Sequence, residues 1–196
     1  MSGPSTVLPP RSELASRVAE LNDLVVFGAF EDDELRRLTR QVDDLLESAG
    51  SSRQPWWEST EPDRAYRARS PFAGSDNPRA PHVVFAAGVD DDGRPTMVAE
   101  VTLDKAYAGP PGAVHGGMLA GLFDEVIGAA AGAAAPGRVV VTGKLTVRYR
   151  TPTPLRIPLR IEAAVTRRSN RLLPVVARCE ADGRLTATAE ALMVLR

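Results

Sequence analysis

Cysteine and histidine are scarce in this chain of 196 residues, and neither charge sign is in clear excess. One cysteine cannot form an internal disulfide, and two histidines without ligand spacing predict no metal site. Apolar runs stay short of the roughly 20 residues that span a bilayer, and the first residues lack the pattern of a signal peptide. A net charge of −1 offers no basic surface for nucleic acid. We therefore expect a cytoplasmic protein with no metal, no cofactor of its own, no membrane span and no nucleic-acid partner.

The composition is that of an ordinary globular protein, with 43% hydrophobic residues. The length fits one domain with an extension. We interpret residues 1–80 as an N-terminal extension, with a disordered start, two helices and a long loop. Residues 81–196 form the predicted main domain.

Two helices are predicted in the extension from apolar residues at helical spacing. Ser12 can cap the first helix, and Asp32 or Asp33 can cap the second, which Gly50 ends. The outer face of the second helix mixes acidic and basic residues. A DNA-recognition helix needs a basic face, so these helices argue against a DNA-binding regulator.

The most informative stretch, VHGGMLAGLFDEVIGAAAGAAA, runs from Val114 to Ala135. From Met118 onward it lacks proline and is rich in alanine and leucine, which predicts a helix. Successive residues lie 100° apart, so small residues gather on one side and large apolar residues on the other. The small side holds Gly117, Ala120, Gly121, Asp124, Gly128 and Ala131. Each interior glycine costs about 1 kcal/mol relative to alanine, so this side is expected to pack closely and to leave room near the carboxylate.

The predicted helix begins with His115, Gly116 and Gly117, where backbone N–H groups are expected to be unpaired and the helix dipole is positive. Such donors suit a carbonyl oxygen that gains negative charge during attack. Asp124 lies about two turns farther along the same side, whereas Glu125 points about 100° away as a polar flank. The helix alone fits two interpretations equally well. In one, the small side packs tightly against a partner and Asp124 is a solvated carboxylate; in the other, the helix carries a reactive site.

Alternating polar and apolar residues predict six strands, two before the long helix and four after it. The predicted strands are 82–88, 95–103, 138–150, 155–167, 172–181 and 184–195. This order predicts an α+β fold in which the helix lies against an antiparallel sheet. Pro158 and Pro174 predict edge positions or bulges, because proline cannot donate to the ladder.

The His-Gly-Gly helix start, the acidic residue nine positions after the histidine, and the following VTGKLTVRYRTPTP resemble the hotdog-fold acyl-CoA thioesterases, in particular the PaaI-like and THEM4-like group. The resemblance runs from Pro81 to the C-terminus. It implies a hotdog fold, with the sheet wrapped around the helix. It also implies a homodimer or homotetramer with sites between subunits, and hydrolysis of a fatty or aromatic acyl-CoA.

Roles for individual residues follow from this resemblance. The Gly117 amide would polarise the thioester carbonyl, and His115 would orient the loop or contact the substrate. Asp124, which in the family's arrangement comes from the partner subunit, would activate water as a general base or attack directly, and both routes stay open. Gly116 and Gly121 would lie against the substrate.

The resemblance also points to residues on the strands. Thr142 matches the position of a Ser or Thr that orients the water. Strand alternation places Thr142 on the polar side with Lys144, opposite Leu145, so the assignment requires that side to reach a subunit interface. Arg168 and Asn170 lie in the turn where relatives contact the nucleotide of coenzyme A.

Other functions remain open at this stage. A hotdog protein could bind acyl-CoA or an acyl carrier without turnover, although a pure binder gains nothing from a carboxylate beside the thioester. A dehydratase or hydratase is disfavoured by the position of the histidine. The loop 50–80, with its Trp56-Trp57 pair, either packs on the domain or closes over an acyl chain, and packing is favoured.

Overall fold

The computed structural model describes residues 9–50, 55, 58–61, 66–90, 94–167 and 169–196. The tryptophan pair and Arg168 therefore lie outside the described residues. Contacts divide the chain into two compact units. The first comprises Met1–Ser70 and Ser75–Pro78, and the second comprises Pro71–Gly74 and Arg79–Arg196.

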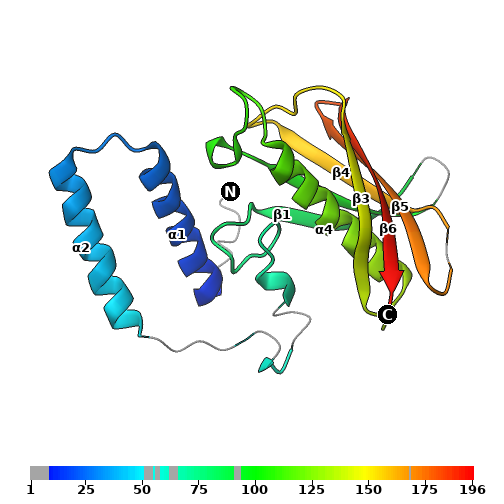
Figure 1. The fold of residues 1–196 in the computed structure, drawn as a ribbon, viewed down its shortest axis with the longest axis horizontal. Coiled ribbons are helices and arrows are strands. Elements are labelled where there is room, and N and C mark those ends of the chain that lie inside the picture. Colours follow the sequence, from blue (N-terminus) through cyan, green and yellow to red (C-terminus); the bar gives the residue numbers. More distant parts are fainter. Residues whose placement is uncertain (1–8, 51–54, 56–57, 62–65, 91–93, 168) are drawn as a thin grey trace, which may run out of the picture. The chain divides into compact units, whose positions relative to one another are not determined.

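The first unit contains the helices α1 (Pro10–Phe27) and α2 (Asp32–Ala49) (Figure 1). The prediction that Ser12 caps α1 is wrong. Pro9 precedes the helix, and Pro10 begins it, because proline has no N–H to leave unpaired there. Ser12 is buried within the helix, and its hydroxyl donates to Asp76 Oδ1 at 2.7 Å.

The cap of α2 also differs from the prediction. Glu31 precedes the helix and forms a reciprocal capping box with Glu34, so neither Asp32 nor Asp33 is the cap. The Glu34 carboxylate reaches back to the Glu31 amide at 3.2 Å, which satisfies a donor that helix geometry leaves unpaired. Gly50 ends the helix as predicted.

The second unit is a six-stranded antiparallel sheet that carries one long helix. The strands are β1 (Val83–Val89), β2 (Pro95–Thr102), β3 (Val140–Tyr149), β4 (Pro158–Val165), β5 (Leu172–Ala181) and β6 (Arg184–Leu195). Their order across the sheet is β1-β2-β4-β5-β6-β3, so β1 and β3 are the edges. The short η2 (Lys105–Tyr107) leads to the long helix α4 (Gly116–Ala134). The predicted strand and helix order and the α+β class are confirmed.

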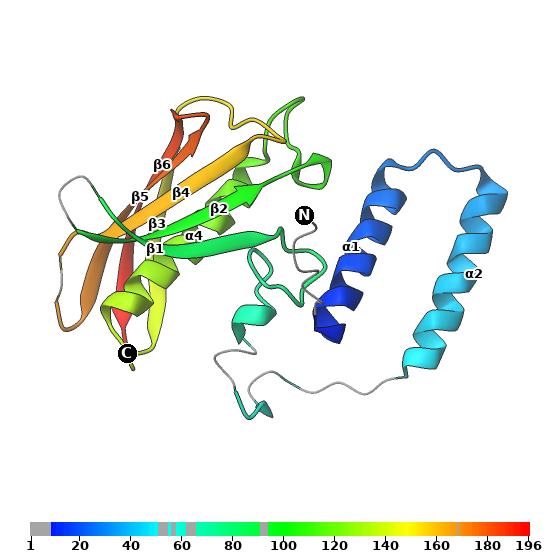
Figure 2. The same ribbon diagram turned by 180° about the vertical axis from the view of Figure 1, so that it is seen from behind.

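Helix α4 lies along one face of the sheet (Figure 1), and the reverse view shows β1, β2 and β4 in front of it (Figure 2). Its large side is buried against the sheet, with Leu122, Phe123, Val126 and Ile127 fully inaccessible. By length and composition α4 could also span a membrane, a test that core helices of globular domains pass as well. Its packing identifies it as the core helix, because burying these side chains is the main favourable term for the fold.

The two prolines lie in central strands and away from any register shift, so the prediction of edge positions or bulges is wrong. Pro158 is the first residue of β4, where a missing N–H interrupts no ladder. Pro174 lies inside β5, but β4 ends at Val165, and the Thr166 amide donates to the Pro174 carbonyl at 3.0 Å. The proline therefore sits where regular pairing with β4 has ended.

Candidate active site

A β-bulge in β3 brings Thr142 to the helix. Thr142 pairs with Met193 and Lys144 with Leu192, so Gly143 is an extra residue without a partner. A side-chain carbon at Gly143 would lie 2.9 Å from Val194 and 3.1 Å from the Leu192 carbonyl oxygen, so glycine fits there. The extra residue reverses the alternation, and the predicted polar-side position of Thr142 is wrong.

Thr142 consequently faces α4 and meets the only carboxylate on the small side of that helix. Its hydroxyl donates to Asp124 Oδ1 at 2.7 Å, a distance typical of a strong hydroxyl–carboxylate bond. Both residues are exposed in the single chain. Among the described residues, the structure shows no further hydrogen bond to the carboxylate, so Oδ2 is open. Thr142 and Asp124 therefore meet within one chain, whereas the sequence analysis required the side of Thr142 to reach a subunit interface.

The helix start is organised by His115. Its amide donates to the Tyr107 carbonyl at 2.8 Å, and its carbonyl accepts from Met118 and Leu119. Its ring Nδ1 accepts from the Gly117 amide at 3.0 Å, so His115 is the N-cap. The expectation that the Gly117 amide is unpaired is therefore wrong.

One backbone donor stays open at this point. Within the part of the chain that the structure describes, Gly116 has the one amide in the first turn of α4 that donates to no protein group. A neutral histidine that accepts at Nδ1 carries its proton on Nε2, so His115 presents an Nε2–H donor. The helix start thus offers two donors where the helix dipole favours negative charge.

Tyr149 belongs to the site although the sequence analysis did not select it. Its hydroxyl donates to the Gly116 carbonyl at 2.7 Å, which ties the end of β3 to the first residue of α4. A side-chain carbon at Gly116 would lie 3.3 Å from the tyrosine ring and hydroxyl. The available signal was an aromatic hydroxyl on the apolar side of a strand, since such a group requires a hydrogen-bond partner.

The space predicted beside Asp124 is only partly empty. At Gly121 the ring of Phe72 occupies it, and a side-chain carbon there would overlap three ring atoms. At Gly128 and Gly132 a side-chain carbon would meet nothing within 4 Å. The small side of α4 is therefore covered by Phe72 at Gly121 and uncovered at Gly128 and Gly132, whereas Ala131, expected on this side, is fully buried in the core.

Comparison with known proteins points to one family. Residues 111–188 match the model of the thioesterase superfamily. Over this part, the chain is similar to the proteins of that superfamily.

Solved structures agree with this assignment. One described as a thioesterase superfamily protein is 26% identical, covers 99% of this chain and 94% of its own, and superposes with a TM-score of 0.76. A candidate thioesterase from Ralstonia eutropha, described as phenylacetic acid degradation-related, is 27% identical over 56% of this chain and 83% of its own, with a TM-score of 0.50. Zebra fish thioesterase superfamily member 2 is 17% identical over 72% and 91%, with a TM-score of 0.52. The predicted hotdog fold is confirmed, and no curated protein matches the chain.

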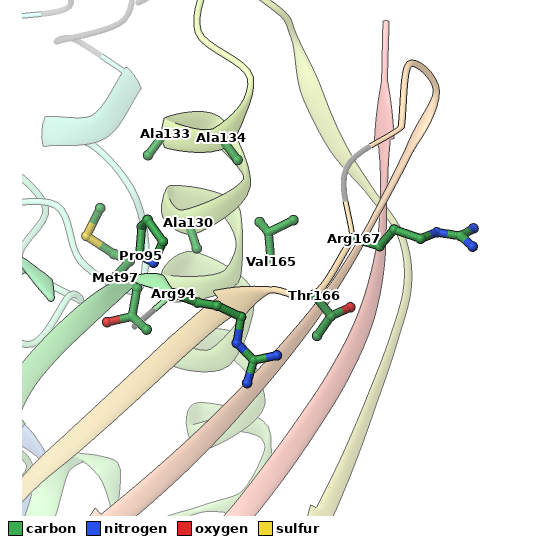
Figure 3. A pocket seen from close by; sticks show the side chains of 10 residues that line it. Arg94, Pro95, Met97, Ala130, Ala133, Ala134, Val165, Thr166 and Arg167 are labelled. Carbon is green, nitrogen blue, oxygen red and sulfur yellow. The ribbon is translucent and has the colours of Figure 1, made fainter. Parts of the chain in front are cut away.

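A cavity of about 320 Å³ lies in the second unit near the C-terminal end of α4, and Asp124 does not line it. Ala130, Ala134 and Val165 contribute small apolar surfaces to its wall. The side chains of Arg94 and Arg167 extend away from these alanines (Figure 3). The cavity and the Asp124–Thr142 pair are therefore separate features of the second unit.

The predicted nucleotide contacts lie in the turn between β4 and β5. Asn170 is exposed there, next to Ser169, whose hydroxyl donates to the Leu172 carbonyl at 2.6 Å and accepts from the Leu172 amide at 3.0 Å. Arg168 belongs to the same turn but lies outside the described residues. The structure does not bring Asn170 into hydrogen-bonding contact with Asp124 or Thr142.

A separate charged cluster lies on the sheet face away from α4. Glu162 is 6% exposed and accepts from Arg160 at 2.8 Å, from Arg178 at 2.9 Å and from Thr96 at 3.0 Å. The Arg160 guanidinium, followed by Thr96 and Arg178, holds the pKa of Glu162 at about 2, although burial acts to raise it. The same pairing raises the pKa of Arg160. All its partners are structural, so this carboxylate stabilises the sheet and has no free oxygen to offer a reaction.

Proposed function

We propose that the protein hydrolyses the thioester of an acyl-CoA to a free acid and coenzyme A. The observation that carries this proposal is the 2.7 Å bond from the Thr142 hydroxyl to Asp124, on the small side of the helix that begins with His115. The match of residues 111–188 to the model of the thioesterase superfamily supports the reaction class. The acyl group is fatty or aromatic in this proposal.

The helix start is the proposed site for the thioester carbonyl oxygen. The Gly116 amide and the His115 Nε2–H are the available donors, since Gly117 already donates to His115 Nδ1. Donors fixed in place before the reaction stabilise the developing oxyanion without a cost of reorientation. The role first expected for the Gly117 amide thus passes to Gly116, and Gly117 positions the imidazole.

Asp124 acts as a general base on a thioester held at the helix start of a second copy of the chain, because Gly116 and Asp124 of one chain are about 12 Å apart along α4. Thr142 holds Oδ1, and Oδ2 takes a proton from water as the water oxygen bonds to the carbonyl carbon. The carbon–sulfur bond then breaks, and the leaving thiolate recovers the proton from Asp124. The products are the carboxylic acid and the thiol of coenzyme A. The alternative is direct attack by Asp124, which forms an anhydride that water hydrolyses.

A second copy of the chain completes the proposed site. Asp124, Thr142 and His115 are all exposed in one chain, whereas electrostatic stabilisation of an oxyanion is strongest where water is excluded. The uncovered positions Gly128 and Gly132 leave space for another chain to approach α4. We propose a homodimer or homotetramer with sites between subunits, in which Arg168 and Asn170 contact the nucleotide.

The test measures thiol release from short, long and aromatic acyl-CoAs by the parent protein and an Asp124→Asn variant. Phenylacetyl-CoA is included because one relative is described as phenylacetic acid degradation-related. We expect the variant to lose at least about two orders of magnitude in kcat, the scale of general-base catalysis. Glu125→Gln is the matched control, since it neutralises the adjacent carboxylate on another side of α4.

Two outcomes decide among the alternatives. A folded parent that binds acyl-CoA but releases no thiol would favour a non-catalytic acyl-CoA or acyl-carrier binding protein. For an active parent, a single turnover in heavy-oxygen water separates the two routes. General-base hydrolysis places the heavy oxygen in the acid product and leaves Asp124 unlabelled. In direct attack followed by hydrolysis of the anhydride at the Asp124 carbonyl, the acid carries an ordinary oxygen from Asp124, and the heavy oxygen enters Asp124.

A further inference from the structure

Phe72 packs on the small side of α4 at Gly121. A side-chain carbon built at Gly121 would come within van der Waals overlap of Phe72 Cδ1, Cε1 and Cζ. The aromatic ring therefore lies directly against the helix backbone, and only glycine leaves room for it. Phe72 is half-buried and belongs to Pro71–Gly74, which is part of the same compact unit as α4 and the sheet.

The chain on both sides of this segment is held by hydrogen bonds. The Asp76 amide donates to the Ala68 carbonyl at 2.7 Å, and the Asn77 side chain donates to the Arg69 carbonyl at 3.0 Å. These bonds join the two ends of a short loop whose middle carries Phe72. The ring is thus presented by a closed loop rather than by a free strand of chain.

Gly121 and the proposed general base are neighbours on the helix. Asp124 follows Gly121 by three residues, which corresponds to about 4.5 Å along the axis and about 60° around it. Phe72 consequently covers the helix surface on the N-terminal side of Asp124. On the C-terminal side, Gly128 is open. A thioester placed at Asp124 therefore meets an aromatic wall on one side only.

We infer that Phe72 determines which acyl groups the site accepts, by limiting the space beside Asp124. This inference rests on the proposed thioesterase function. The ring fills volume that the glycine at position 121 would otherwise leave to the substrate. The wall favours acyl groups that end at or stack against the ring and disfavours those that must pass it.

The first experiment compares the parent with Phe72→Ala on butyryl-CoA and dodecanoyl-CoA. Each methylene group newly buried in the vacated space raises kcat/KM by about fourfold, so two raise it on the order of tenfold. We expect the dodecanoyl-to-butyryl ratio of kcat/KM to rise by this factor. Phe27→Ala, the same truncation at the end of α1, is the control and leaves the ratio unchanged.

A second variant tests the contact itself. Gly121→Ala places a methyl group where the Phe72 ring lies, so the ring must move, and the denaturant midpoint of unfolding falls. In the Phe72→Ala background the methyl group finds space, and Gly121→Ala then lowers the midpoint much less. Such non-additivity is expected only for residues in contact. Equal effects of Gly121→Ala in the two backgrounds would refute the contact between Phe72 and Gly121.

Failure of this inference can be told from failure of the proposed function. Suppose that the parent hydrolyses acyl-CoAs and that Phe72→Ala changes kcat/KM for every acyl-CoA by the same factor. Phe72 then does not select the acyl group, and the proposed hydrolase function is unaffected. If the parent releases no thiol, calorimetry with S-butyl-CoA and S-dodecyl-CoA thioethers decides instead. If Phe72→Ala changes the ratio of the two affinities, Phe72 limits the acyl group in a protein that binds without hydrolysis. If the ratio is unchanged, the inference about Phe72 is refuted.

Discussion

Neutralising Glu162 should destabilise the protein at neutral pH and do so much less in acid. The pKa of this carboxyl lies at about 2 instead of the ordinary 4.5 because Arg160, Thr96 and Arg178 bind its charged form. This lowering corresponds to about 3 kcal/mol of folding free energy as an upper limit. The two guanidiniums are 41% and 44% exposed, so solvent screening reduces the expected effect to roughly 1–2 kcal/mol.

The sign follows from the direction of the pKa shift. A carboxyl whose pKa is lowered by folding stabilises the folded state fully above its ordinary pKa of 4.5 and loses this contribution as the pH falls towards about 2. Glu162→Gln should therefore lower the free energy of unfolding by roughly 1–2 kcal/mol at about pH 7, and the difference from the parent should shrink at about pH 3.

Denaturant unfolding at both pH values measures this difference. Glu190→Gln is the matched control, because Glu190 is an exposed carboxylate on the neighbouring part of the same sheet. The reasoning is refuted if Glu162→Gln lowers the free energy of unfolding no more than the control does at about pH 7. If the loss of unfolding free energy is as large at about pH 3 as at about pH 7, the electrostatic explanation in particular is refuted.

Two further predictions follow from the site and the core. Thr142→Val should lower kcat by about tenfold with little change in KM, because it removes the hydrogen bond to Asp124, and Thr142→Ser should retain most activity. Steady-state kinetics checks this, and a serine variant as slow as the valine variant would contradict it. Cys179 is fully buried and burial raises the pKa of its thiol, so iodoacetamide should alkylate it only after unfolding. Mass spectrometry detects the adduct, and rapid labelling of the native protein would show that the thiol is accessible.

Local patterns in the sequence were sufficient for the order of the elements. The strands 172–181 and 184–195 agree with β5 and β6 residue for residue, because alternation and the Asp182-Gly183 turn are local signals. The helix, its buried side and the position of Asp124 also followed from periodicity. The choice of Thr142 came from the motif of the resembled family, not from alternation.

Alternation failed at Thr142 for a physical reason. A bulge adds one residue and reverses every side chain beyond it, and the need for glycine at 143 arises from Val194 and Leu192, which lie far away in the sequence. The caps of α1 and α2 were misassigned because several residues near a helix start can serve as caps, and the geometry selects one.

The sequence by itself determined the α+β class, the core helix and the chemical groups of the candidate site, since these depend on periodicity and on residue type. Only the tertiary structure decided that the Thr142 hydroxyl bonds to Asp124 and that Phe72 covers Gly121. It also decided that the Gly117 amide donates to the His115 ring, which leaves the Gly116 amide as the available donor. Each of these depends on distances of a few ångströms, set largely by where the loops and the sheet bring the chain. Sequence spacing carries no such information when the contacting residues lie on different elements.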